Sequence, residues 1–343
     1  MSPETPPSNS NAGLKVAKKK PKATAKLKRP KDTAEERARA RVWAYFEDQP
    51  DTVFYSRQIE ILFEREFFHW VTNRAIRGLI DEGRIRTERR ELESGSEVKL
   101  LWHKNNRFYK READRVYRLV DEYTSSASSG TLGLQGESLV LAAFARQRFL
   151  LVGEETNEYC DKKWTATGHD LDFVFERDGI GYGIEVKNTL GYMEIAEFHT
   201  KIKMAQHLGI RPVFVVRSLP SIWVEPLVRV GGYAMIMGFQ FYPWTHKELA
   251  NRIRDTLGLP VDTPKRIEHG TMQRFENWIA SPRGASAAFD PEAAVRADIV
   301  LSRMKSQYQR KLAYAERAQE AARRAAEGEE PAEGYDEDPQ DDR

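Results

Sequence analysis

The chain has 343 residues, of which 40% are hydrophobic and 31% are charged. This length predicts about two folded domains with appendages, and the composition supplies enough apolar side chains for real hydrophobic cores. The longest apolar runs, residues 139–145 and 233–239, are much shorter than the roughly 20 residues that a bilayer-spanning helix needs, so no membrane partner is expected.

The net charge is only +2, because the chain has two oppositely charged tails whose charges cancel. Met1–Arg41 carries twelve Lys or Arg and four acids, whereas Glu327–Arg343 carries nine acids and one Arg. We expect residues 1–33 to be a disordered basic arm and 327–343 a disordered acidic tail. The first thirty residues contain no apolar segment typical of a secretory signal, and Cys160 is the single cysteine, which favours a cytoplasmic setting without disulfides.

A first domain is expected at residues 34–110. Apolar side chains at helical spacing predict three helices, and the period then changes to two, which indicates two strands around the turn Ser94-Gly95-Ser96. The expected elements are helices at 34–46, from an N-cap at Ser56, and at 68–82, and strands at 85–92 and 98–102.

Three helices followed by a basic hairpin is the order of a winged helix. The segment IRGLIDEGRIRTERRELESGSEVKLLW, residues 76–102, resembles that family. The resemblance implies DNA binding through the third helix, which reads the major groove, and through phosphate contacts from the hairpin. Winged helices also bind proteins, and that alternative stays open. The residues concerned are Asn73, Arg74 and Arg77 on the exposed side of the third helix, and Arg84, Arg86, Arg89 and Arg90 on the hairpin.

The remainder of the chain divides at a segment rich in Ser, Gly and Thr, TSSASSGTLGLQG, which is typical of a flexible linker. Alternating strands and helices beyond it indicate an α/β domain built on a sheet. The expected regions are a helix and linker at 111–135, the α/β domain at 136–257, and a C-terminal helical extension at 258–326 with a long helix at 291–327.

The candidate chemistry lies in a predicted hairpin that begins after His169. Apolar residues alternate with acids along its first strand, and Asp178-Gly179 is a dipeptide that a two-residue type I′ turn prefers. If those two residues form the loop, Arg177 pairs with Ile180, and the same register places Asp172 opposite Glu185.

The same register places Asp170 opposite Lys187, and all four side chains share one face. Opposed residues have Cβ atoms about 5 Å apart, which is close enough for Asp172 and Glu185 to share a cation that would relieve their repulsion. Oxygen ligands without thiolates or a His cluster favour Mg²⁺, with Mn²⁺ possible. A two-metal variant would recruit Glu137 and the backbone carbonyl of Val186.

An Asp followed by Glu-x-Lys on the next strand resembles the PD-(D/E)XK nuclease superfamily. The matching residues are Asp172, Glu185 and Lys187, and Glu137 matches the acid that many members carry on the first core helix. The resemblance covers residues 136–241. It implies a restriction-endonuclease-like core, a mixed sheet flanked by helices, in which the acids bind Mg²⁺ and the lysine orients or activates the attacking water.

Several assignments have alternatives at this stage. Leu171 stands where the family name has Pro, so Asp170 competes with Asp172, although spacing and register favour Asp172. The hairpin acids could form structural ion pairs, and Glu137 could be a helix N-terminal acid that the dipole favours. Lys201 and Lys203 are further candidates for DNA contacts, although a solvated helix face is the favoured interpretation of both.

These features predict a metal-dependent DNA endonuclease in which a winged helix locates DNA and the α/β domain hydrolyses a phosphodiester bond. Restriction or another defence against foreign DNA suits that pairing, because several restriction enzymes combine the two modules. A homodimer is expected, since such nucleases often break both strands. The alternatives are a repair or Holliday-junction-type nuclease and a non-catalytic DNA-binding regulator, and RNA as a substrate stays open.

Overall fold

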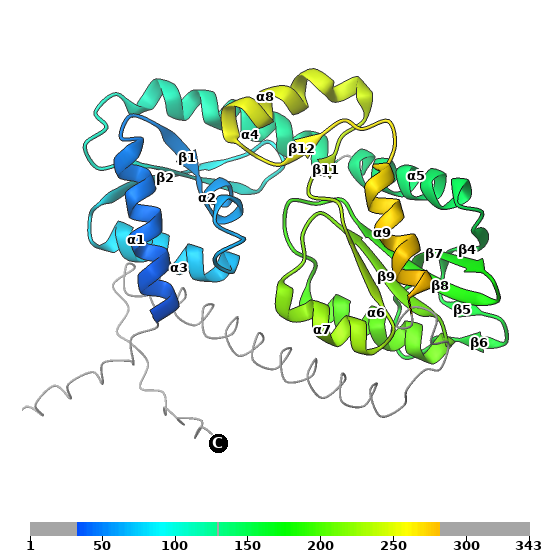
Figure 1. The fold of residues 1–343 in the computed structure, drawn as a ribbon. Helices are drawn as coiled ribbons and strands as arrows, with labels where there is room; N and C mark the ends of the chain where they lie inside the picture. The colour runs from blue at the N-terminus through cyan, green and yellow to red at the C-terminus, as the bar shows by residue number, and fades with distance from the viewer. Residues whose placement is uncertain (1–32, 129, 282–343) are drawn as a thin grey trace, which may run out of the picture.

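The computed structural model describes residues 33–128 and 130–281, which form a mixed α/β fold (Figure 1). The expectations for the basic arm up to residue 32, and for the helix and acidic tail after residue 281, lie outside the described residues. Within the described ranges, no helix combines the length and the apolar character needed to cross a membrane.

The first part of the chain forms a domain of three helices and a three-stranded antiparallel sheet in the order β1-β3-β2, here called the N-terminal domain. Ile59, Ile76 and Leu79 are completely buried in its core, as the helical spacing of apolar residues predicts. Strand β1 was not expected, because three residues are too few to show a period of two. The elements are α1 (Thr33–Asp48), β1 (Val53–Tyr55), α2 (Ser56–Leu62), α3 (His69–Asp81), β2 (Ile85–Glu91) and β3 (Glu97–His103).

The second part is built on a five-stranded mixed sheet in the order β10-β9-β8-β7-β4. Strand β7 is antiparallel to β4 and to β8, whereas β8, β9 and β10 run parallel. Parallel neighbours need crossover connections, which α6 and α7 provide. The elements are β4 (Leu150–Thr156), β7 (Leu171–Arg177), β8 (Ile180–Lys187), α6 (Ile195–Leu208), β9 (Arg211–Val216), α7 (Ser221–Arg229) and β10 (Tyr233–Ile236).

Helices cover both faces of this sheet (Figure 1). On one face, Phe144 of α5 (Thr131–Arg146) stacks on Phe175 of β7. On the other face, Phe198 of α6 packs against Phe214 of β9. Because successive strand residues point to opposite faces, the neighbouring Val215 belongs to the core under α5. A side chain's position along a strand therefore decides which set of helices it meets.

A further core joins the two parts of the chain. Helix α4 (Tyr109–Ser128) packs on β1 and β3 and also on α8 (Lys247–Leu257). Helix α9 (His269–Ala280), expected in an extension after residue 258, packs instead on the sheet with α5. An amphipathic pattern in the sequence shows that a helix buries one face, but it does not show which element packs against that face. The remaining short elements are β5 (Glu158–Tyr159), β6 (Lys162–Lys163), β11 (Gln240–Phe241), a 3-10 turn (Trp244–His246) and β12 (Val261–Asp262).

The helix expected at the start of residues 111–135 is confirmed, but the segment after it, expected to be a flexible linker, is largely helical. Helix α4 continues to Ser128, and α5 begins at Thr131. Leu132 is buried in the core beneath α4, and the hydroxyl of Thr124 donates a hydrogen bond to the Val120 carbonyl one turn earlier. Gly130, with φ of 74°, makes the turn between the two helices. Composition alone did not reveal that Leu132 is buried.

Candidate active site

The hairpin has the predicted turn and register. Asp178 and Gly179 both adopt positive φ, 56° and 74°, as a type I′ turn requires. Arg177 pairs with Ile180, and the ladder continues in the same register to Phe173 and Ile184. Extending this register by one residue places Asp172 opposite Glu185.

The two strands diverge where these acids lie. The ladder between β7 and β8 ends at Phe173 and Ile184, although both strands continue. Beyond it, the Val186 N–H donates a hydrogen bond of 2.6 Å to Oδ2 of Asp172. The N–H and C=O of one strand residue point to the same side, so the Val186 carbonyl also points towards the start of β7. The carboxylate and carbonyl proposed from the sequence are thus directed into the same gap.

Glu185 is the most buried acid of the site, at 2% exposure. Its Oε1 lies 3.1 Å from Nζ of Lys187 and its Oε2 lies 2.5 Å from Nζ of Lys201. Each oxygen therefore has an ammonium partner, which occupies one of its two lone pairs. Glu185 therefore retains lone pairs for a cation although two ammonium groups are close to it.

Burial raises the pKa of both opposed acids. For Asp172, desolvation raises the pKa, against the Val186 hydrogen bond and the charges of Lys201 and Lys187. For Glu185, desolvation raises the pKa first and the neighbouring Asp172 charge adds to it, against the two lysines. Two opposed acids that burial makes harder to ionise, one of them further because the other is charged, form a site that a divalent cation would stabilise.

Lys187 lies between two carboxylates. Its Nζ lies 3.1 Å from Glu185 and 2.8 Å from Glu197 of α6. Burial lowers the pKa of Lys187, but the charges and hydrogen bonds of Glu185 and Glu197 outweigh it and raise the pKa above its ordinary value. The ammonium therefore stays charged at neutral pH and acts as a donor. The role of Glu197 was not predicted, because its contact crosses from a helix to a strand.

Glu137 lies near the other acids. It lines the same cleft as Asp172 and Lys187, and burial followed by the charges of Glu155, Glu154 and Glu185 raises its pKa. Among the described residues, no group of three His, Cys, Asp or Glu side chains lies close enough to hold a metal ion. The predicted metal role of Glu137 stays a prediction.

Gly136 allows α5 to approach the end of β8. A Cβ at Gly136 would lie 2.9 Å from Cβ of Asn188 and 3.3 Å from Cγ1 of Val186. The Gly136→Ala variant should therefore lose about 1–3 kcal/mol of unfolding free energy through overpacking, measured by denaturant titration. Gly133→Ala is the matched control, because its Cβ would meet only Oε1 of Glu137 at 3.7 Å. Equal stability of the two variants would contradict the close approach.

Two sequence assignments change at this site. Asp170 is exposed and precedes β7, so it does not extend the ladder to face Lys187. Its backbone carbonyl accepts a hydrogen bond from Lys201, and the structure favours Asp172 as the acid opposite Glu185. Lys201 is only 5% exposed, so it neither forms a solvated helix face nor reaches DNA phosphates. Helix α6 crosses the face of the sheet from which Glu185 projects, so the Lys201 ammonium points towards the sheet and not towards solvent. Lys203 is half-buried.

The third-helix residues are less accessible than predicted. Asn73 and Arg74 are half-buried rather than exposed, because α3 packs between α1 and α2. Nδ2 of Asn73 donates a hydrogen bond of 2.7 Å to Glu60, and Arg74 lies 3.3 Å from Glu35. Arg77 is also half-buried, but it lies near Lys99 and adds to the positive charge there.

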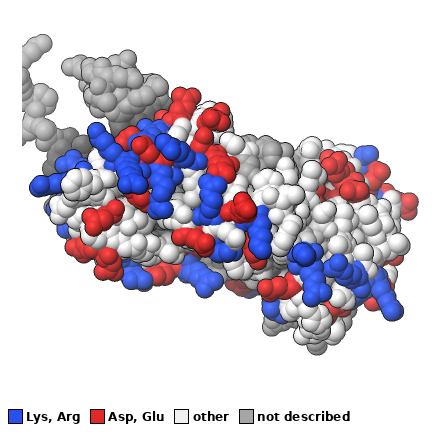
Figure 2. Space-filling model, turned by 90° about the horizontal axis from the view of Figure 1, so that it is seen from above, with Lys and Arg blue, Asp and Glu red and all other residues white. Residues whose placement is uncertain are grey.

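The hairpin arginines divide into two kinds. Arg84, Arg86 and Arg89 are exposed, and Arg84 also lies over the Trp43 ring. Arg90 is half-buried and forms ion pairs with Glu88 and with Asp114 on α4, so it is the least available of the four to contact a phosphate. Seen from above, Lys and Arg gather most densely over the N-terminal half, interspersed with acids (Figure 2).

Asn188 is a positioning residue that sequence reasoning missed. Its Nδ2 donates to the carbonyls of Leu132 and Phe241 at 2.6 and 2.7 Å, and its Oδ1 accepts from the Phe241 N–H. These bonds tie the end of β8 to α5 and β11. The only sequence signal was its place directly after Lys187, which does not reveal partners so distant along the chain.

Comparison with known proteins identifies no relative: no family model, curated protein or solved structure matches the chain.

Proposed function

We propose that this chain is a metal-dependent DNA endonuclease of the PD-(D/E)XK type, with a winged helix as its N-terminal domain. The observation that carries the proposal is the gap between β7 and β8, where Asp172 lies opposite a buried Glu185 and Lys187 follows two residues later. The order of helices and strands in the N-terminal domain is consistent with a winged helix. Restriction or another defence against foreign DNA is the role we propose for this pairing.

The residues present fit Mg²⁺ or Mn²⁺. Each oxygen of Glu185 keeps a lone pair beside its ammonium partner, and Oδ1 of Asp172 and the Val186 carbonyl would complete a set of hard oxygen donors. When bound, such an ion lowers the pKa of water and neutralises charge on a reacting phosphate. Glu137 is the candidate for a second ion.

Side chains of the protein would position the water, the metal-binding acids and the DNA. Lys187 stays protonated because Glu185 and Glu197 raise its pKa against the effect of burial, so it donates hydrogen bonds to the attacking water or to a phosphate oxygen and does not remove a proton. Lys201 holds Glu185 in place from the helix side. Arg86 and Arg89 on the hairpin are exposed and suited to phosphate contacts that position the duplex.

Plasmid cleavage tests the proposal. Purified protein incubated with supercoiled plasmid should nick or linearise it in Mg²⁺ or Mn²⁺ and should leave it intact when EDTA is present. Protein that retards the plasmid in a gel but never cuts it, with both metals screened, would instead be a DNA-binding regulator.

Metal affinity should rise with pH. Asp172 and Glu185 have folded-state pKa values raised by burial, so protons compete with the cation above the ordinary carboxylate range. As the pH rises through the raised values, both acids ionise and affinity increases, after which it levels. Calorimetric titration with Mn²⁺ in two buffers of different ionisation enthalpy should detect proton release. A pH-independent affinity without proton release would contradict the assignment.

A further inference from the structure

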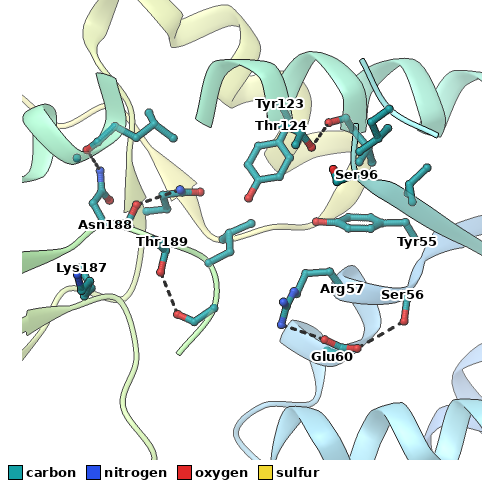
Figure 3. A pocket seen from close by; sticks show the side chains of 18 of the residues that line it. Tyr55, Ser56, Arg57, Glu60, Ser96, Tyr123, Thr124, Lys187, Asn188 and Thr189 are labelled. Atoms are coloured by element: carbon teal, nitrogen blue, oxygen red, sulfur yellow. Dashed lines mark hydrogen bonds and ion pairs between the residues drawn. The ribbon is translucent and has the colours of Figure 1, made fainter. Parts of the chain in front are cut away.

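The cleft lined by Asp172 and Glu137 extends between the N-terminal domain and the α/β domain. It has a volume of about 710 Å³, and its lining includes Asp172 and Lys187 at one end and Tyr55, Arg57 and Lys99 at the other. Figure 3 shows Tyr55 and Tyr123 directing their hydroxyls into the space between the two parts of the chain. A cavity of this size takes a ligand of about one or two nucleotides.

Two buried polar groups on the cleft wall lack partners. Tyr55 is 7% exposed, and its hydroxyl has no hydrogen-bond partner among the described residues. Gln240 is 3% exposed; its Nε2 donates to the Asn188 carbonyl, but its Oε1 accepts no hydrogen bond from the described part of the chain. Leaving a buried polar atom unsatisfied costs about 1–3 kcal/mol, which a polar ligand would relieve.

Positive charge leads into the cleft from the hairpin. Arg89, which also pairs with Glu97 at 3.3 Å, lies directly opposite Lys99 in the β2–β3 ladder, and a like-charge pair in this position destabilises a hairpin. Desolvation, followed by the charges of Arg89 and Arg77, lowers the pKa of Lys99, and Lys99 forms no ion pair within residues 33–128 and 130–281. A phosphate placed between these cations would relieve their repulsion.

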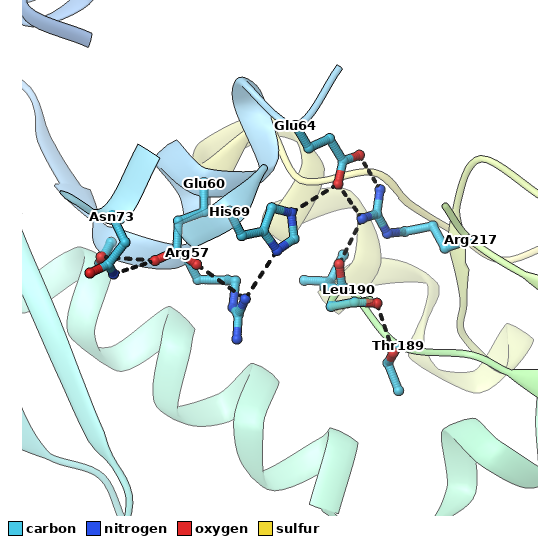
Figure 4. A network of polar contacts seen from close by, with 10 residues as sticks. Arg57, Glu60, Glu64, His69, Asn73, Thr189, Leu190 and Arg217 are labelled. Carbon is cyan, nitrogen blue, oxygen red and sulfur yellow. Dashed lines mark hydrogen bonds and ion pairs between the residues drawn. The ribbon is translucent and has the colours of Figure 1, made fainter. Parts of the chain in front are cut away.

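The cleft has a fixed width. Arg217 at the end of β9 donates two hydrogen bonds, of 2.6 and 2.5 Å, to Glu64 in the turn after α2 (Figure 4). Tyr192 stacks on His69 with ring centroids 4.1 Å apart. These contacts join the two domains beside the cleft, so widening it to admit a duplex would break a buried ion pair.

We propose that the interdomain cleft binds an unpaired stretch of the substrate strand, with phosphates against Lys99 and its neighbours, a base against the tyrosines, and the next phosphodiester at Asp172 and Lys187. This inference rests on the proposed nuclease function and specifies its substrate as single-stranded or locally strand-separated DNA. Aromatic side chains beside cations are the usual means of holding a single strand without reading its sequence.

Fluorescence anisotropy in EDTA tests the cleft separately from catalysis. The probes are a labelled single-stranded DNA oligonucleotide and the same strand annealed to its complement. We expect the single strand to bind at least about tenfold more tightly than the duplex. Tyr55→Phe should weaken single-strand binding about fivefold, the value of one hydrogen bond, without lowering the melting temperature, because the lost hydroxyl was unsatisfied.

Lys99→Gln should weaken single-strand binding about three- to tenfold and reduce its salt dependence, again without loss of stability, because a like-charge pair is removed. Arg229→Gln is the control: Arg229 is exposed on α7 and pairs with Glu225, and it should bind like the parent. Equal binding of single strand and duplex, or normal single-strand binding by both cleft variants, would overturn the inference. If plasmid were still cut in that case, the nuclease proposal would stand. A single-strand preference without cleavage in any metal would support the cleft and refute the nuclease.

Discussion

Asp172→Asn is expected to reduce plasmid cleavage by at least about two orders of magnitude while the protein remains folded. The amide oxygen of Asn can still accept the 2.6 Å hydrogen bond from the Val186 N–H, so the local backbone keeps its partner. What is lost is the negative charge opposite Glu185 that would hold a divalent ion. Initial cleavage rates in Mg²⁺ and in Mn²⁺, compared at equal protein concentration, measure the effect.

Two further variants make this result specific. Asp178→Asn removes a carboxylate from the turn of the same hairpin, at a positive φ that Asn tolerates, and should cut like the parent. Asp170→Asn distinguishes the two candidate acids, since Asp170 is exposed and lies outside the ladder. Loss of cleavage in Asp170→Asn with normal cleavage in Asp172→Asn would reverse the assignment. Normal cleavage by both would remove the hairpin from the active site.

The hairpin was predictable because its geometry is local. A two-residue turn at Asp178-Gly179 fixes the pairing of every residue that follows, and the period of two fixes which side chains share a face. The sequence therefore placed Asp172 opposite Glu185 and put Lys187 on the same face, and the observed ladder has that register.

Contacts between elements were not predictable in the same way. Lys201 seemed suited to solvent or DNA because a helix pattern shows only that a residue is polar, and its ion pair with Glu185 depends on how α6 crosses the sheet. The Ser-rich segment before Thr131 looked like a linker, because composition does not register that Leu132 is buried beneath α4. In both cases tertiary packing, and not local sequence propensity, determined whether the residues were buried.

A buried ion pair, which sequence patterns could not reveal, contributes to the coupling of the two domains. Arg217 is 3% exposed, and besides Glu64 it donates a hydrogen bond of 2.7 Å to the Leu190 carbonyl. Desolvation raises the pKa of Glu64, but the hydrogen bonds from Arg217 and His69 outweigh it and lower the pKa. Glu64 is therefore ionised and stabilises the fold above its ordinary pKa.

Arg217→Met should destabilise the protein by about 3–5 kcal/mol near neutral pH, because it leaves the Glu64 carboxylate buried without its guanidinium. Denaturant unfolding measures the loss, and the second variant Glu64→Gln, combined with Arg217→Met, should recover part of it because no uncompensated charge remains. As the pH falls through the lowered pKa of Glu64, the carboxylate becomes neutral and the difference from the parent should shrink.

Arg229→Met provides the comparison, since its pair with Glu225 is exposed and should contribute less than about 1 kcal/mol. Equal effects of the two Arg→Met changes would mean that Arg217 does not link the domains. A large loss for Arg217→Met that appears as a separate early unfolding transition would instead indicate that the N-terminal domain and the sheet have become independent. Because the cleft lies between these two units, single-strand binding should then weaken even though Lys99 and Tyr55 are unchanged.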